Sequence, residues 1–152
     1  MQVEQIKDIL DWLSKYHHQM SLCYDRSANR SESSRIKMLL SYLAEHEQSL
    51  ADAVAKYEKI ADSQVLNTWC YEYMDHKPDL AEALCSTDLD QLSLEQIVSR
   101  CVAAHDELIV LYRYLLGRSD TDRLKELFEN LIQLEQNESM RMVRDTSSYA
   151  DL

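Results

Sequence analysis

The sequence predicts an all-α protein, a single-domain bundle of four helices arranged as two antiparallel hairpins that one long crossover joins. The chain has 152 residues, the size of one domain. It contains one glycine and one proline, which leaves little material for β-turns. Its apolar residues recur at steps of three and four, the spacing of amphipathic helices.

The first hairpin is predicted from helices at about residues 2–26 and 33–62. A polar segment rich in N-cap residues, near residues 27 to 32, gives the short connection between them. The predicted core stripes are Val3, Ile6, Leu10, Leu13, His17, Met20 and Tyr24 in the first helix, and Ile36, Leu40, Leu43, Glu47, Leu50, Val54, Tyr57 and Ala61 in the second.

The second hairpin is predicted from helices at about residues 93–117 and 121–146. Ser93 and Gln96 have the spacing of a capping box, Gly117 is expected at the C′ position, and Thr121 offers an N-cap beside Ser119 and Asp120. The predicted core stripes are Leu94, Ile97 or Val98, Cys101, His105, Leu108, Tyr112 and Leu115, followed by Leu124, Phe128, Leu131, Glu135, Glu138 and Met142.

The crossover is expected at about residues 63–92, where the helical periodicity weakens. It contains an aromatic cluster of Trp69, Tyr71 and Tyr73, and Pro78 breaks the chain before a short helix from Leu80 to Leu84. We favour a role for the aromatic cluster in capping one end of the bundle over a role as a dimer patch. A link of this length can run along the bundle and reverse the order of the helices.

The net charge of -11 argues against nucleic acid or an anionic membrane surface as a partner, because both attract clustered Lys and Arg. No apolar run approaches the roughly 20 residues needed to span a bilayer, and the N-terminus lacks a signal-peptide pattern. We therefore expect a cytoplasmic protein. The four cysteines form no Cys-x-x-Cys pair, and we interpret Cys23, Cys70, Cys85 and Cys101 as reduced, inert thiols.

Five polar residues interrupt the core stripes, and a charge in a core is costly unless it is paired or bound to metal. They are His17, Glu47, His105, Glu135 and Glu138. At about 1.5 Å of rise per residue, Glu135 and His105 should be level, whereas Glu47 and His17 differ in depth by about 8 Å. The five therefore predict either a self-paired polar layer or a site for iron, manganese or zinc. If a helix is rotated, the neighbours His46, Asp106 or Glu107 could take their places.

The segments 43–50 (LAEHEQSL) and 128–138 (FENLIQLEQNE) resemble the second and fourth helices of rubrerythrin-like members of the ferritin superfamily. The resemblance implies a ferritin-like bundle in which each of these helices carries Glu-x-x-His, with carboxylates from the other two, around two irons that react with oxygen or peroxide. Glu47 and Glu135 match the motif glutamates, but Leu50 and Glu138 stand at the histidine positions, and Glu-x-x-His occurs nowhere in the sequence.

The missing histidines favour a degenerate, non-catalytic ferritin-like bundle, a homodimer through an exposed helix face, that binds a partner protein or small ligand. The alternative is a divergent metalloprotein with redox or oxygen chemistry that uses the five polar residues. The sequence has no glycine-rich phosphate loop and no recognisable nucleophile motif, and it leaves open whether the protein is an enzyme.

Overall fold

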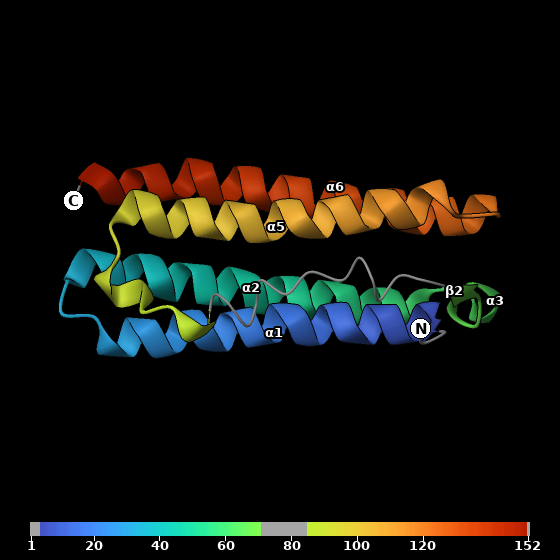
Figure 1. Cartoon of the computed structure of the whole chain (residues 1–152), viewed down its shortest axis with the longest axis horizontal. Helices are drawn as coiled ribbons and strands as arrows, with labels where there is room; N and C mark the ends of the chain where they lie inside the picture. Colours follow the sequence, from blue (N-terminus) through green and yellow to red (C-terminus); the bar gives the residue numbers. More distant parts are fainter. Residues whose placement is uncertain (1–3, 71–84, 152) are drawn as a thin grey trace.

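The computed structural model describes residues 4–70 and 85–151, and four long helices make up most of this part. They are α1 (Ile6–Arg30), α2 (Ser34–Ile60), α5 (Leu94–Gly117) and α6 (Asp122–Thr146). α1 and α2 form one antiparallel hairpin, and α5 and α6 form the other (Figure 1). α2 and α5 point in the same direction, so the link between them must span the length of the bundle. The predicted bundle of two hairpins is confirmed.

Shorter elements lie near the ends of the bundle. They are β1 (Glu4–Gln5), α3 (Ser63–Leu66), β2 (Trp69–Cys70), η2 (Leu89–Gln91) and η3 (Ser147–Asp151). β1 and β2 pair antiparallel, and the N–H of Ile6 donates to the carbonyl of Thr68 at 2.9 Å. The start of α1 is thereby hydrogen-bonded to the chain that leaves α2. The sequence did not predict this strand pair, because two residues are too few to show a period of two.

α1 begins and ends later than the sequence predicts. The predicted connection at residues 27 to 32 is partly wrong, because α1 continues to Arg30 and buries Ser27 and Ala28, which leaves residues 31–33 as the connection. Ser33 caps α2, since its hydroxyl accepts a hydrogen bond from a backbone N–H of the first turn. The polar composition of this segment therefore marked the connection correctly but not the turn of helix before it.

The second hairpin follows its predicted boundaries closely. Ser93 and Gln96 form the predicted capping box, with reciprocal hydrogen bonds of 2.9 and 3.2 Å, and Thr121 caps α6. Gly117 is the last residue of α5 and not a C′ residue, so that prediction is wrong. Arg118 forms the cap instead, because its backbone N–H reaches carbonyls of the last turn without a left-handed glycine.

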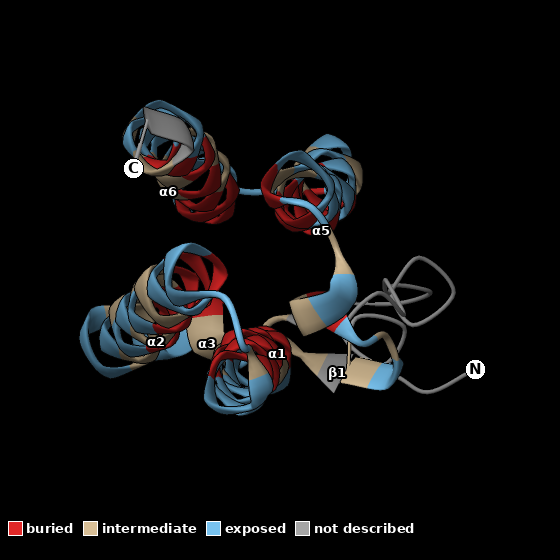
Figure 2. Ribbon diagram, turned by 90° about the vertical axis from the view of Figure 1, so that its left-hand side faces the viewer, coloured by how far each residue is buried: buried red, intermediate tan, exposed pale blue. Residues whose placement is uncertain are grey.

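The buried faces of the four helices point toward one another (Figure 2). Most predicted stripe residues in the described part are buried, and Ile97 faces the core in preference to Val98. On α6 the buried stripe passes from Glu135 to Ser139, so Glu138 lies at its edge and is half-buried. None of the helices in the described ranges combines the length and apolar character that crossing a lipid bilayer requires.

Two of the cysteines are oxidised. Cys23 in α1 and Cys85 in the crossover form a disulfide, with their Cα atoms 5.2 Å apart, which fits a disulfide bridge. The interpretation of these two as reduced thiols is therefore wrong. The reason is spatial, because the sequence does not show that Cys85 lies beside α1. Cys101 carries a free, buried thiol, as expected.

The middle of the crossover lies outside the described residues. The side chains of the aromatic cluster, Pro78 and the predicted short helix from Leu80 to Leu84 all fall in this part of the chain. The capping role of the aromatic cluster and the short helix therefore stay predictions.

Candidate metal centre

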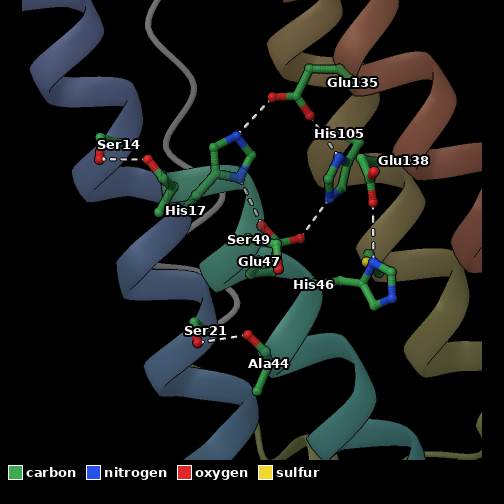
Figure 3. A network of polar contacts seen from close by, with 12 residues as sticks. Ser14, His17, Ser21, Ala44, His46, Glu47, Ser49, His105, Glu135 and Glu138 are labelled. Carbon is green, nitrogen blue, oxygen red and sulfur yellow. Dashed lines mark hydrogen bonds and ion pairs between the residues drawn. The ribbon is translucent and has the colours of Figure 1, made fainter. Parts of the chain in front are cut away.

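Four of the five predicted residues meet at the centre of the bundle (Figure 3). His17 Nδ1 lies 2.7 Å from Glu47 Oε2, and His17 Nε2 lies 2.7 Å from Glu135 Oε1. His105 Nδ1 lies 2.8 Å from Glu135 Oε2, and His105 Nε2 lies 2.6 Å from Glu47 Oε1. The four side chains, each 0% exposed, therefore form a closed ring in which histidine and glutamate alternate. We call this set the His–Glu ring.

Each long helix supplies one member of the His–Glu ring at the same depth. His17 lies 13 residues before the end of α1 at Arg30, and Glu47 lies 13 residues after the start of α2 at Ser34. The depth difference predicted for this pair disappears because α1 is longer at its C-terminal end than the sequence indicated. All four side chains belong to the apolar stripes of their helices, so the packing that forms the bundle also brings them together.

Hydrogen bonding fixes the charges in the His–Glu ring. Both nitrogens of each imidazole face a carboxylate oxygen, and an ionised carboxylate can only accept, so each imidazole donates twice and is protonated. Burial opposes this charge, but the carboxylates of Glu135 and Glu47 outweigh burial and raise the pKa of His17 to about 9. The pKa of His105 is also raised, against the effect of burial.

The two carboxylates respond in the opposite direction. Burial alone would raise the pKa of Glu47 and of Glu135, but the adjacent imidazolium groups outweigh burial and hold both pKa values below their usual range. Two positive imidazoles and two negative carboxylates make the His–Glu ring electrically neutral. This neutrality explains how four ionised groups can be buried together, since a net charge in a core is costly.

The two hairpins contribute to the ring in the same way. Glu47 follows His17 by 30 residues, and Glu135 follows His105 by 30 residues. A tyrosine also lies seven residues after each histidine, Tyr24 in α1 and Tyr112 in α5. This equal spacing is the sequence signal that could have predicted the alternation, because it relates the hairpins to each other by an offset of 88 residues.

Buried tyrosines lie near the His–Glu ring. The Tyr112 hydroxyl donates to Glu135 Oε1 at 3.0 Å. The buried hydroxyls of Tyr16 and Tyr24 have no nitrogen or oxygen hydrogen-bond partner among the described residues. Burial and then the charges of neighbouring groups, Glu47 among them, raise the pKa of both. Both hydroxyls are therefore potential hydrogen-bond donors inside the core.

Cys101 adds a sulfur atom that the sequence-based site did not include. Ligand atoms of Cys101, Glu47 and His105 all lie within 4.8 Å of one another, and all three residues are buried. Cys101 precedes His105 by four residues, which places both on the same helix face. That spacing was visible in the sequence, but a cysteine on an apolar stripe is an ordinary core residue and gave no reason to single it out.

Glu138 does not join the His–Glu ring. Its carboxylate lies 3.1 Å from Nδ1 of His46, and Arg141 pairs with its other oxygen at 3.2 Å. His46 and Glu138 are partly exposed, with 20% and 14% of their side-chain surface accessible. The other two residues that a rotated helix could have brought to the centre, Asp106 and Glu107, are exposed.

Comparison with known proteins adds a match in fold. No protein-family model matches the sequence, and no curated protein resembles it closely enough to count as a relative. A solved structure from Thermotoga maritima, described provisionally as a ferritin-like diiron-carboxylate protein, aligns over 97% of each chain with a TM-score of 0.61 and 16% identity. The fold is ferritin-like. At this identity the match concerns the arrangement of the helices and not the chemistry of the centre.

Proposed function

We propose that this protein is a ferritin-like metal-binding bundle that holds a divalent transition ion, iron, manganese or zinc, at the His–Glu ring. The observation that carries the proposal is the convergence of four ligand-type side chains, one from each long helix, in a fully buried layer. Imidazole nitrogens and carboxylate oxygens are the usual protein ligands of these ions.

Charge balance supports the same proposal. Without metal, the ring is neutral because two imidazolium groups balance two carboxylates. A divalent ion with two carboxylates and two neutral imidazoles is also neutral. A divalent ion can therefore replace two protons without leaving a net charge in the core. An uncompensated charge there would be costly.

The same count argues against a pair of iron ions like the one that the description of the Thermotoga maritima protein implies. Two ferrous ions carry four positive charges, whereas the His–Glu ring supplies two carboxylates. The excess would be buried among four helices, away from water. Leu50 and Glu138 also stand where the di-iron motif has histidine, and Glu138 pairs with His46 instead. The donor set fits one divalent ion.

Elemental analysis of protein purified without chelators or affinity metal tests the proposal. We expect about one ion per chain, and we expect its loss in the double variant Glu47→Gln, Glu135→Gln, which keeps the shape of both side chains. The control is Glu45→Gln with Glu129→Gln, two exposed glutamates on the same helices. Protein that contains no metal and takes up no added iron, manganese or zinc would refute the proposal.

A second candidate is a non-catalytic bundle that binds a protein partner or a second copy of itself. It is favoured by the complete internal pairing of the His–Glu ring, which satisfies both atoms of every carboxylate and imidazole without a ligand. Exposed apolar side chains on α5 and α6, Val110 and Met140, would be the contact face of a homodimer. Light scattering with Met140→Glu tests this, because the substitution should convert a dimer to a monomer.

A further inference from the structure

The two hairpins differ at a position beside the His–Glu ring that bears on metal binding. Cys101 lies four residues before His105, and the equivalent residue, four before His17, is Leu13. Both side chains are buried. One side of the ring is therefore lined by an aliphatic group and the other by a thiol, so the two halves do not offer the same ligands to an ion.

We propose that the centre holds a single metal ion off the middle of the ring, with Glu47, Cys101 and His105 as its protein ligands. The inference rests on the proposed function and specifies the ligand set of its single ion. The ligand atoms of the three residues lie within 4.8 Å of one another, so small side-chain shifts bring them to one ion. The shortest contact in the ring, 2.6 Å between His105 Nε2 and Glu47 Oε1, joins two of these three ligands.

His105 is oriented for this role by its two hydrogen bonds. Its Nε2 faces Glu47 at 2.6 Å, and its Nδ1 faces Glu135 at 2.8 Å. An ion that replaces the proton between Nε2 and Glu47 leaves the Nδ1–H free to donate to Glu135. Metal-bound histidines commonly donate their second N–H to a carboxylate in this way, which fixes the ring orientation. Glu135 is thus a positioning residue and His105 the ligand.

Charge again favours one ion. The thiolate of Cys101 and the carboxylate of Glu47 balance a divalent ion, with His105 neutral. The remaining pair, His17 and Glu135, stays a neutral ion pair at 2.7 Å. A second divalent ion would add two uncompensated charges to a layer that is fully buried.

The buried hydroxyl of Tyr24 interacts with the same side of the ring through Cys101. Its oxygen is buried and has no nitrogen or oxygen hydrogen-bond partner among the described residues. After burial, Cys101 and Glu47 are the main causes that raise its pKa, and Cys101 also acts on it through a side-chain hydrogen bond. A water or hydroxide in the fourth position of the ion would give the Tyr24 hydroxyl an acceptor.

A thiolate among the ligands favours zinc or iron over manganese, which prefers oxygen ligands.

Titration with Co²⁺, followed by absorption spectroscopy, tests the inference. We expect one cobalt ion per chain and a thiolate-to-cobalt charge-transfer band in the near ultraviolet. Cys101→Ser should remove the band and weaken binding by at least about tenfold, since even indirect partners of a metal ligand contribute that much. The control is Cys70→Ser, a substitution of a cysteine in β2, which should change neither the band nor the affinity for cobalt. Glu135→Gln should weaken binding by about 10–100-fold and keep the band.

The outcomes separate this inference from the proposed function. Cobalt that binds to the wild-type protein without a charge-transfer band would overturn the assignment of Cys101, although the metal-binding function would stand. Two cobalt ions per chain would overturn the single-ion assignment. Failure to bind cobalt, iron, manganese or zinc would overturn the proposed function, and the inference with it. The wild-type spectrum decides the assignment even if the Cys101→Ser variant does not fold.

Discussion

Raising the pH of the metal-free protein should destabilise it, because the His–Glu ring depends on protonated imidazoles. The pKa of His17 is about 9 in the folded protein and 6.5 without its neighbours. A histidine whose pKa is higher in the folded state stabilises the fold fully below its unfolded pKa. That contribution is lost as the pH rises through the folded pKa. Between about pH 6 and 9, the free energy of unfolding should therefore fall.

The size of the effect follows from the two pKa values. At about 1.4 kcal/mol for each pH unit between them, His17 contributes roughly 3 kcal/mol near pH 6 and little above pH 9. The carboxylates act in the opposite direction. The pKa values of Glu47 and Glu135 are lowered in the folded state, so their contribution is present above 4.5 and is lost as the pH falls below it. Stability should therefore be greatest between about pH 5 and 6.5.

Urea unfolding of chelator-treated protein at fixed pH values measures this dependence. His17→Gln should reduce the decline above pH 6.5, leaving the share that comes from His105, whereas His18→Gln should retain all of it, because His18 is an exposed neighbour that pairs with Gln48. Nitrogen NMR of the imidazoles shows directly, in the wild-type protein, whether His17 and His105 are protonated. A stability that is constant or rises from pH 6 to 9, or neutral imidazoles at pH 7, would refute the reasoning.

Three further predictions concern the surroundings of the ring. Tyr112→Phe should lower the free energy of unfolding by about 2 kcal/mol, because the Tyr112 hydroxyl donates to a charged ring carboxylate. Tyr24→Phe, which removes a hydroxyl without such an acceptor, should not lower it, and urea unfolding compares the two variants. Reduction of the disulfide between Cys23 and Cys85, 62 residues apart, should cost about 4 kcal/mol in the same assay, and mass spectrometry after thiol labelling identifies the bonded pair. Glu138→Gln should slow metal uptake in stopped-flow measurements without changing the final stoichiometry, because this partly exposed carboxylate lies beside the buried centre and attracts cations; an unchanged rate would exclude that route.

The fold was predictable because it depends on a signal that repeats along the chain. Apolar residues at steps of three and four fix which face of each helix is buried, and Ile6, Leu40, Leu108 and Phe128 all follow that pattern. Single positions were less predictable. Gly117 was placed outside α5 because glycine often ends helices, although Arg118 makes the cap in this protein.

Which polar residues meet at the centre of the bundle was largely predictable, whereas their geometry was not. A charged residue on an apolar stripe stands out in the sequence, and this was enough to find His17, Glu47, His105 and Glu135. Which of them face each other depends on how the two hairpins are placed, and the only trace of this in the sequence is the equal spacing of histidine and glutamate in the two hairpins. Cys101 was placed on the core stripe but not among the polar residues, because a cysteine there is an ordinary core residue.

The repeated spacing of the two hairpins bears on how the bundle assembles. Each hairpin carries its own histidine and glutamate as a balanced pair, so each half can form without exposing an isolated charge to the other. The bonds between the halves are the same in kind as those within each half. The first hairpin of one molecule therefore has all the groups needed to complete the second hairpin of another, and a domain-swapped dimer would rebuild two intact centres from the same four helices.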